Sequence, residues 1–436
     1  MEHKTEQSLL SPETMENIHH CNKCGLCMAA CPVYKELLLE PASPRGKVQL
    51  SRHLLQGDLE LSPRVKEILS QCLLCGSCVA ACPSGVQGDR LFSGFRWRVT
   101  RRYGVDWKKR ILFQLLAHPW LTAGSARLGR WAKDILGKKL QAGIKAGNLP
   151  LDRIPPFNQQ PFSHQAPEVM NPEGEIRARV FYFHGCATNY LFDRVGHAVL
   201  SVLSKMGIQV ITPKKQGCCG VPMFLSGARE ESLACISEVL KTFASQEVDA
   251  VVVDCATCGS AFVREYPHML GELRSLGEDV SGELIQAAQL LSQKTRDVTA
   301  FIGDHMSWLP EMTQAGPLIK VTYHDPCHLL KAQGIGILPR KVLAGLPNVE
   351  FVEMEAADAC CGGGGSFQVE HPEISAGITS KKIQNVQATG ANVVATGCPG
   401  CRITIGAHLD PELEIGVLHP VELIELAIKA QTGSAP

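Results

Sequence analysis

The stretch His20-Cys-Asn-Lys-Cys-Gly-Leu-Cys-Met-Ala-Ala-Cys-Pro32 decides how the first part of this chain folds. Its spacing is Cys21-x-x-Cys24-x-x-Cys27-x-x-x-Cys31-Pro, and the same spacing returns as Cys72-x-x-Cys75-x-x-Cys78-x-x-x-Cys82-Pro. Three cysteines at intervals of two residues wrap a tight loop around one face of a [4Fe-4S] cubane. The doubled pattern therefore predicts two [4Fe-4S] clusters.

The fourth cysteine of each pattern precedes a proline and cannot fold back onto its own loop. In two-cluster ferredoxins this cysteine ligates the other cluster. We therefore expect one cluster on Cys21, Cys24, Cys27 and Cys82, and the other on Cys31, Cys72, Cys75 and Cys78. A pair of zinc sites is the alternative, but zinc explains neither the third evenly spaced cysteine nor the trailing Cys-Pro.

The chain has 19 cysteines, and 18 of them fall into clusters at ligand spacing. A disulfide framework would need an oxidising compartment, whereas the N-terminus is polar and lacks the apolar stretch of a secretory signal. Metal ligation by thiolates in the cytoplasm is the better interpretation. The remaining cysteine, Cys235, falls in a predicted helix and is expected to be a buried apolar residue.

Length and charge set further bounds. The 436 residues suffice for two to three domains, and the net charge of +0 does not suggest binding to nucleic acid. No uninterrupted apolar run reaches about 18 residues, so we expect no transmembrane helix. The predicted location is cytoplasmic, with peripheral contact on the inner face of the membrane as the further option.

The second half of the chain is a duplicated unit. Strand-like runs at 178–184 and 319–324 lead into Cys186 and Cys327, and further apolar runs are at 208–211, 248–253, 349–352 and 391–395. Helical patterns separate them, as at 227–246 and 372–389. Short apolar strands alternating with helices predict mostly parallel sheet covered by helices, with the cysteines in the loops after the strands.

Each unit contains a lone cysteine, then Cys-Cys-Gly, then Cys-x-x-Cys. The sets are Cys186, Cys218, Cys219, Cys255 and Cys258 in the first unit, and Cys327, Cys360, Cys361, Cys398 and Cys401 in the second. Five thiolates exceed the four that tetrahedral zinc or an ordinary cubane needs. We therefore predict third and fourth metal sites and leave open whether they hold iron–sulfur clusters, zinc or nothing.

The region between the two halves is basic and rich in tryptophan and proline. Residues 90–140 hold 13 Lys and Arg against two Asp, together with Trp97, Trp107, Trp120 and Trp131. This segment either packs onto the ferredoxin-like domain or forms a docking face for an acidic partner or the membrane. Residues 141–175 contain six prolines, which oppose regular structure and indicate a linker.

These motifs resemble one superfamily. Twin Cys-Cys-Gly (CCG) domains after a two-cluster domain are similar to the iron–sulfur subunit of glycolate oxidase, which is also D-lactate oxidising. They are also similar to the C subunit of anaerobic glycerol-3-phosphate dehydrogenase and to the D subunit of heterodisulfide reductase. The run Pro44-Arg-Gly46 and the motif His324-Asp-Pro-Cys327-His look closest to the glycolate oxidase protein.

The resemblance implies an α+β protein with four parts. They are a helical two-[4Fe-4S] ferredoxin-like domain (1–89), a basic Trp-rich helical segment with a Pro-rich linker (90–175), a first α/β CCG domain (176–310) and a second (311–436). It also implies an electron-transfer subunit that works beside an FAD-containing dehydrogenase subunit oxidising glycolate or D-lactate, with a quinone or another carrier as acceptor. No flavin or nicotinamide motif is visible in the chain, and no catalytic residue is assigned.

The alternative within the superfamily is catalytic. Heterodisulfide reductases use complete five-cysteine sets to build non-cubane [4Fe-4S] clusters that reduce a disulfide, and this chain keeps both sets. His184 and His324 precede the first cysteines of the two units. Each is either a hydrogen-bond donor to a cluster or a structural histidine at a strand end.

Overall fold

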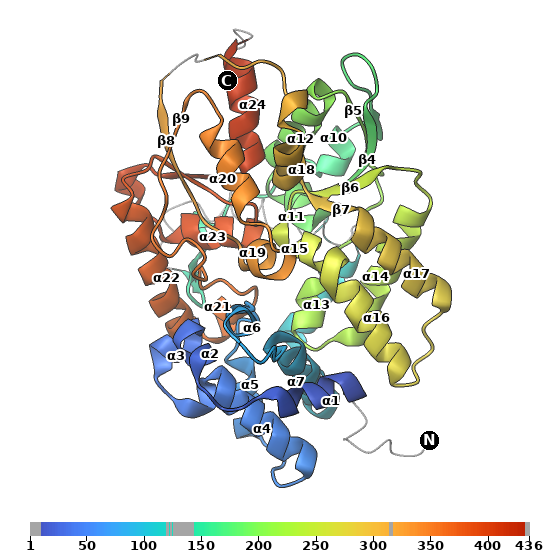
Figure 1. Ribbon diagram of the computed structural model, residues 1–436, viewed down its shortest axis with the longest axis vertical. Helices are drawn as coiled ribbons and strands as arrows, with labels where there is room; N and C mark the ends of the chain where they lie inside the picture. The colour runs from blue at the N-terminus through green and yellow to red at the C-terminus, as the bar shows by residue number, and fades with distance from the viewer. Residues whose placement is uncertain (1–9, 119–121, 123, 125–143, 314–316, 432–436) are drawn as a thin grey trace.

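The computed structural model describes residues 10–118, 122, 124, 144–313 and 317–431. The first part of the chain is helical and forms the base of the molecule (Figure 1). Its helices are α1 (Pro12–Asn17), η2 (Ile18–His20), α2 (Leu26–Ala30), α3 (Pro32–Leu37), η3 (Glu40–Ala42), α4 (Pro44–Gln56), α5 (Pro63–Ser70), α6 (Ser77–Ala80), α7 (Gly88–Tyr103) and α8 (Trp107–Ala117).

Several of these helices begin at a Ser-Pro pair. In α4 the Ser43 hydroxyl accepts a hydrogen bond from the Gly46 amide at 2.9 Å, and Pro44 occupies the first helical position. The same arrangement starts α5 at Ser62-Pro63. A serine cap satisfies an otherwise unpaired amide, and proline has no amide to satisfy at that position, so the sequence itself sets where these helices start.

The core of the helical part lies between α4 and α7. Leu91, Phe92 and Phe95 of α7 are buried in one apolar cluster with Val48 and Leu54 of α4. Cys21, Cys72, Cys78 and Cys82 pack against the edge of this cluster. The cysteine loops are therefore supported on a single rigid base.

The two cysteine-rich units each have their own sheet. The first sheet has the order β3-β5-β4-β6-β7, parallel except for the β3–β5 pair, and the second has the parallel order β11-β10-β8-β9. The strands are β3 (Val169–Met170), β4 (Ala178–Phe183), β5 (Ile208–Ile211), β6 (Ala250–Val253), β7 (Thr295–Asp297), β8 (Ile319–Tyr323), β9 (Val349–Phe351), β10 (Val393–Ala395) and β11 (Gly416–Leu418).

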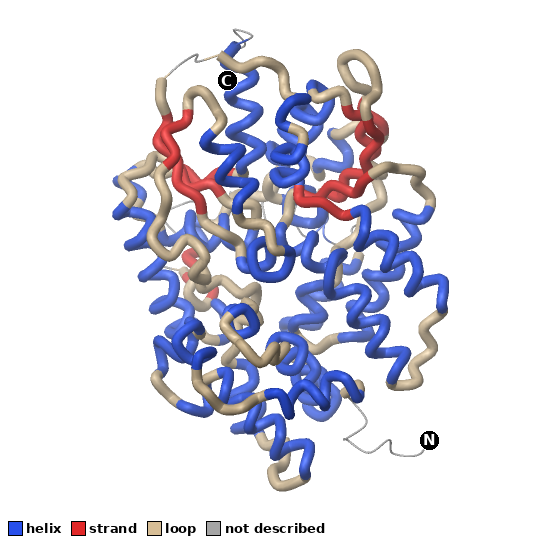
Figure 2. Tube along the Cα trace, in the orientation of Figure 1, coloured by secondary structure: helices blue, strands red, loops and turns tan. Residues whose placement is uncertain are grey.

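Helices lie between and around the two sheets (Figure 2). In the first unit they are α10 (Phe162–Gln165), α11 (Gly185–Tyr190), α12 (Asp193–Lys205), α13 (Val221–Leu225), α14 (Arg229–Ala244), α15 (Ala256–Ser260), the π-helix η5 (Ala261–Glu265), α16 (Tyr266–Ser275), α17 (Gly282–Lys294), α18 (Val298–Asp304) and η6 (Met306–Trp308). In the second unit they are α19 (Cys327–Gln333), α20 (Ile337–Ala344), α21 (Phe367–Glu370), α22 (Pro372–Ala388), α23 (Pro399–His408), η7 (Pro411–Leu413) and α24 (Pro420–Gln431).

The two units share one apolar core. Helices α12 and α18 of the first unit pack against α24 and α20 of the second, between the two sheets (Figure 1). Tyr182 of β4 and Tyr323 of β8 belong to the same buried cluster, to which Val199 and Ile424 contribute from the helices. The duplicated units therefore form one hydrophobic body.

The predicted fold class is confirmed: a helical two-cluster part is followed by a duplicated α/β unit. The six apolar runs form strands, and the helices expected at 227–246 and 372–389 are α14 and α22. Strands β3, β7 and β11 were not expected. They have two or three residues each, too few to show a periodic pattern.

The expectation that prolines keep residues 141–175 irregular is wrong for the described residues from 144 onward. These contain β1 (Lys145–Ala146), β2 (Leu149–Pro150), η4 (Leu151–Arg153), α10 and β3. The Phe162 side chain is fully buried in the shared core, and β3 extends the first sheet. Short elements fit between the prolines because each needs only a few amides. The proposed domain boundaries themselves stay a prediction.

The basic segment is helical where it is described, as α7 and α8. Trp97 is buried in the core of the first cysteine-rich unit rather than in the ferredoxin-like part, and Arg229 stacks on it at 4.2 Å. Trp107 is 65% exposed, and Trp120 and Trp131 lie outside the described residues. No helix in the described part of the chain is long and apolar enough to cross a bilayer.

Candidate metal centres

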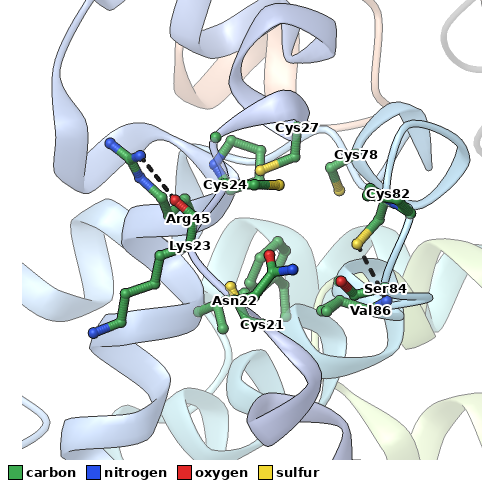
Figure 3. Close-up of a pocket in the computed structure, with 16 residues that line it drawn as sticks. Cys21, Asn22, Lys23, Cys24, Cys27, Arg45, Cys78, Cys82, Ser84 and Val86 are labelled. Carbon is green, nitrogen blue, oxygen red and sulfur yellow. Dashed lines mark hydrogen bonds between the residues drawn. The ribbon is translucent and has the colours of Figure 1, made fainter.

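Three cysteines of the first motif and the last cysteine of the second surround one cavity. Cys21, Cys24, Cys27 and Cys82 line this first cavity together with Cys78, and the cavity spans about 450 Å³, part of which is open solvent. Figure 3 shows these sulfurs converging from two loops. The structure thus brings together the four residues that the spacing predicts for one cluster, across a gap of more than fifty residues.

The second cavity has the reciprocal arrangement. Cys31, Cys72, Cys75 and Cys78 line it, and it encloses about 400 Å³. Pro44, Cys78 and Phe92 line both cavities, so a single layer of side chains separates them. The ligand assignment remains a prediction, and this exchange of the two trailing cysteines favours it.

The two loops have the same unusual backbone. Lys23 and Leu74, each just before the second cysteine, have φ angles of 63° and 50°, and Gly25 and Gly76, each just after it, have 86° and 70°. Positive φ is rare for residues with a side chain. Its recurrence at both matching positions shows that each loop curls around a centre, which a cubane would occupy.

Backbone amides point at several of these sulfurs. Sγ of Cys31 accepts from the Tyr34 amide at 3.4 Å, Sγ of Cys72 from Leu74 at 3.5 Å, and Sγ of Cys82 from Val86 at 3.4 Å. Amide donors favour the ionised form of a sulfur. They would stabilise thiolate ligands in both cavities.

Burial works against free thiolates here. Together with the neighbouring thiolates, burial raises the pKa of Cys31 to about 11 and the pKa of Cys78 well above its ordinary value. Four sulfurs in such a cavity ionise together only when a cation compensates their charge. Soft, all-sulfur donor sets select iron–sulfur clusters or zinc, so the residues fit the predicted group.

In the first cysteine-rich unit, five sulfurs converge from three loops. Cys186 and Cys218, Cys218 and Cys219, and Cys258 with both Cys219 and Cys255 lie close enough to shift one another's pKa. Donation by its neighbours lowers the pKa of Cys219. The five predicted residues therefore form one connected site.

The second unit repeats this pattern. Sγ of Cys361 lies 3.4 Å from Sγ of Cys401, and Cys360 with Cys361 and Cys398 with Cys401 lie close enough to shift one another's pKa. The pKa of Cys361 is lowered, as for Cys219. Cys327 is less buried than the other four and lies among Cys361, Cys398 and Cys75.

A glycine in each Cys-Cys-Gly sequence allows both cysteines to face inward. Gly220 and Gly362 have φ angles of 77° and 89°. A side chain on Gly362 would overlap the Thr379 hydroxyl, whose helix packs directly against the loop. Only glycine fits this conformation and this contact together.

The two histidines before the cysteines are not equivalent. In the first unit Nδ1 of His184 pairs with the Gly185 carbonyl at 2.9 Å, and its ring packs against Phe162. In the second unit one ring nitrogen of His324 lies within 4.8 Å of the sulfurs of Cys361 and Cys401, and the described residues offer neither of its nitrogens a hydrogen bond of normal geometry. His324 thus lies beside two sulfurs with both nitrogens unpaired. His184 has one paired and one unpaired nitrogen, and among the described residues it is not grouped with sulfurs in this way.

The Cys-x-x-Cys loops of the two units touch each other. The Ala256 amide donates to the Gly397 carbonyl at 2.9 Å, and the Thr257 hydroxyl lies 3.7 Å from Sγ of Cys398 and 3.1 Å from Nδ1 of His328. The sequence carries no signal for these contacts between units. They place the third and fourth sites side by side.

The second ferredoxin-type loop also reaches the second unit. Cys75 and Cys327 line one cavity of about 380 Å³, together with His328, Lys331 and residues of α7 and η5. Nζ of Lys331 donates to the Ser77 hydroxyl at 2.8 Å and to the Asp358 carbonyl at 2.9 Å. The fourth site is therefore the neighbour of the second cavity.

Two buried lysines near these cysteines were missed by the sequence analysis. Lys47 and Lys382 are each 2% exposed. Both occupy the apolar face of their helix: in α4 the buried positions are 44, 47, 48, 51 and 54, and in α22 they include 378, 379, 382, 383 and 386. A lysine at a core position of the helical repeat was the available signal.

Comparison with known families agrees with this architecture. Residues 17–86 match the 4Fe-4S dicluster domain, and residues 180–263 and 321–406 match the cysteine-rich CCG domain. The fold and the sulfur sites define an iron–sulfur protein that combines a dicluster domain with two cysteine-rich domains.

Curated relatives narrow the class. The chain is 28% identical to a probable glycolate oxidase iron–sulfur subunit of Bacillus subtilis, covering 94% of this chain and 93% of that one. It is 31% identical to lactate utilization protein A of Oceanobacillus iheyensis (56% and 96% covered), and 24% identical to the D subunit of a heterodisulfide reductase of Methanosarcina mazei (98% and 97%). The chain belongs to the CCG-domain iron–sulfur subunit family that contains these proteins, and iron–sulfur clusters are its cofactors.

Proposed function

We propose that this chain is the iron–sulfur electron-transfer subunit of an oxidoreductase complex. In this complex an FAD-containing partner subunit oxidises a 2-hydroxy acid, glycolate or D-lactate, and a quinone or another carrier accepts the electrons. The observation that carries the proposal is the pair of adjoining four-cysteine cavities, the second of which opens toward Cys327. The names of the Bacillus and Oceanobacillus relatives support the choice of substrate class.

When bound, [4Fe-4S] clusters accept and release single electrons, which suits a subunit that follows a flavin. The protein side of this task is to hold the ligands and exclude water. Val48, Val86 and Phe92 provide apolar walls to the first cavity, and Leu73 and Leu74 provide them to the second. A low dielectric around the sites and fixed ligand positions keep the reorganisation energy small.

The first cavity is the one nearest the surface. Of the 19 cysteines, all within the described residues, only Cys24 is exposed. Leu26 near it in the sequence is 56% exposed, and Leu38 and Leu39, which follow α3, are 71% and 53% exposed. Exposed apolar side chains beside a site that exchanges electrons suit the docking of a partner subunit. We assign this face to contact with the flavin-containing subunit.

The experiment is anaerobic co-purification with the partner subunits, followed by iron analysis and EPR spectroscopy. The two [4Fe-4S] clusters of the dicluster domain require about eight irons per chain. Addition of D-lactate or glycolate to the complex should then reduce the clusters and produce their EPR signal. The isolated chain without its partner should stay oxidised under the same treatment. Zinc with no iron, or clusters that neither acid reduces, would contradict the proposal.

A second function is favoured by one specific observation. The sulfurs of each cysteine-rich unit lie close together, and the Methanosarcina relative is part of a heterodisulfide reductase. A disulfide would then be reduced at non-cubane clusters in these units. Iron well above eight atoms per chain, with a new EPR signal when a thiol is added to the oxidised protein, would favour this function over the first.

A further inference from the structure

Lys47 is a buried cation beside the second cavity. Its side chain is 2% exposed, it lines the cavity with Cys31 and Cys72, and its Nζ donates to the Ala42 carbonyl. No carboxylate among the described residues lies within ion-pair distance of it. A buried ammonium group is unstable without a countercharge, so the anion that balances Lys47 must come from what the cavity binds.

The charges around Lys47 point the same way. Burial lowers the pKa of Lys47 and the nearby Arg96 guanidinium lowers it further, whereas the groups that raise it are the Cys72, Cys31 and Cys78 sulfurs in their thiolate form. These are three of the four predicted ligands of the second site. Lys47 thus lines the same cavity as the sulfurs that would hold the cluster.

Lys382 repeats this situation in the second cysteine-rich unit. It is 2% exposed, and its Nζ donates to the Ala356 and Ala357 carbonyls at 2.7 and 3.2 Å, with no carboxylate of the described residues within ion-pair distance. Burial lowers its pKa, and the groups that raise it most are the thiolates of Cys361 and Cys360.

The other two sulfur sites lack such a lysine. At the first cavity Lys23 is exposed, and Arg45 is neutralised by Glu40 through hydrogen bonds of 2.8 and 3.0 Å. Lys382 comes 21 residues after Cys361. The residue 21 positions after Cys219 in the first cysteine-rich unit is Leu240, which is 1% exposed. The buried arginine of that unit, Arg229, is paired with Glu272 at 2.5 Å.

We propose that Lys47 and Lys382 are built-in counter-ions of the second dicluster site and of the second unit's cysteine site, and that they make these two sites the preferred location of an added electron. The proposal rests on the electron-transfer function proposed above. A fixed positive charge stabilises the state with one more negative charge, most strongly where the surroundings exclude water.

The placement of the two lysines gives this preference a direction. The two sites that they serve are neighbours: Leu73 and Cys360 are buried in one apolar cluster, and Cys75 and Cys327 line one cavity. The first cavity, without an unpaired buried cation, lies on the exposed side at Cys24. Electrons that enter there are therefore drawn toward the junction of the dicluster domain with the second unit.

The test for Lys47 is a redox titration of the anaerobic protein monitored by EPR. The signals are assigned beforehand with Cys24→Ala and Cys75→Ala, each of which removes one site. Lys47→Met and Lys47→Gln should lower the ratio of reduced to oxidised second cluster about tenfold at a fixed potential, which is about 59 mV for one electron. The first cluster should not move, and Lys47→Arg should restore the native ratio.

Arg45→Met on the same helix is the matched control, because it removes a cation that Glu40 already neutralises. It should change neither ratio appreciably. Equal shifts of both clusters, or no shift in either neutral Lys47 variant, would overturn the proposal. Lys47→Met and Lys47→Gln could instead fold and lose only the second cluster, while Lys47→Arg keeps it. This result would also support a required positive charge at position 47. Loss in all three variants would overturn it.

The test for Lys382 is the rate at which a chelator removes metal from the second unit. Lys382→Met should lose that metal at least about threefold faster than the native chain, because the anionic site loses its counter-ion. Leu240→Met in the first unit is the matched control and should leave the rate unchanged; equal rates would overturn this half of the proposal. Native protein with no iron would overturn the proposed function as well, whereas normal clusters with unmoved potentials would overturn this inference alone.

Discussion

Cys75, in the second ferredoxin-type loop, and Cys327, the first cysteine of the second cysteine-rich unit, line the same cavity although 252 residues separate them in the chain. One is a predicted ligand of the second cluster and the other of the fourth site. Lys331 holds the two loops together through Ser77 and Asp358. The dicluster domain thus contacts the second cysteine-rich unit at a point where both carry cysteines of their proposed sites.

The exchange of trailing cysteines between the loops predicts which cluster each variant removes. Cys82→Ala should abolish the EPR signal that Cys24→Ala abolishes, and should leave the signal of the site on Cys72 and Cys75. Iron should fall by about four atoms per chain. Cys235→Ala is the control, because Cys235 is buried in α14 outside the proposed ligand sets, and it should keep all the iron. Loss of the other signal would mean that each loop supplies all four of its own ligands.

The difference between the two histidines predicts an asymmetric response. His324→Ala should weaken metal retention by the second unit about ten- to a hundredfold, the usual effect of removing a residue that contacts a metal group or its ligands. His184→Ala should have a smaller effect on metal in the first unit, since Nδ1 of His184 pairs with the Gly185 carbonyl and its ring packs against Phe162. The measurement is metal content after timed dialysis against a chelator. Equal losses in both units would contradict the assigned role of His324.

The buried pair Arg229–Glu272 predicts a large stability effect. The two side chains are 2% exposed and 2.5 Å apart, and Glu272 also accepts a hydrogen bond from Thr14 of α1. Glu272→Ala leaves the arginine charge buried and unpaired, so it should lower the free energy of unfolding by about 3–5 kcal/mol. Glu238→Ala, which removes an exposed partner of Lys241, should lower it by no more than about 0.5 kcal/mol. Urea titration of both variants checks the difference.

Glu265 predicts a pH dependence of stability. Burial raises its pKa from 4.5 to about 7, Asp89 adds to this, and Arg264 and Arg90 oppose it. The native chain therefore holds this proton more tightly than the unfolded chain, so stability is greatest below about pH 4.5 for this group and declines as the pH rises to about 7. In Glu265→Gln the free energy of unfolding should fall by up to about 3 kcal/mol less over this pH range than in the native chain. The measurement is the free energy of unfolding at several pH values. An unchanged slope would contradict the raised pKa.

Local patterns made much of the fold predictable. The apolar runs before Cys186, Cys255, Cys327 and Cys398 are buried strands, and a short apolar run with many β-branched residues is typical of a buried strand. The cysteines follow these strands because loops at the carboxyl ends of parallel strands gather at one edge. Strands β3, β7 and β11 escaped prediction because they exist only through pairing with a neighbour.

Spacing alone could also group the eight dicluster cysteines, since ligand intervals reflect the size of the cluster that they surround. It could not show which way His184 and His324 turn, because each follows the same kind of strand in a similar sequence context. Lys47 and Lys382 were visible as charged residues on apolar helix faces. Their meaning depends on the thiolates opposite them, which only the folded chain brings near.

The common core of the two cysteine-rich units has a consequence for the history of the chain. Since Tyr182 and Tyr323 are buried in one cluster, and α12 rests on α24, neither copy has a complete interior without the other. Once this packing existed, deletion of one copy would have exposed the apolar face of its twin. The two copies remained free to diverge in the groups around their sulfurs, as the different surroundings of His184 and His324 show, but had lost the freedom to separate.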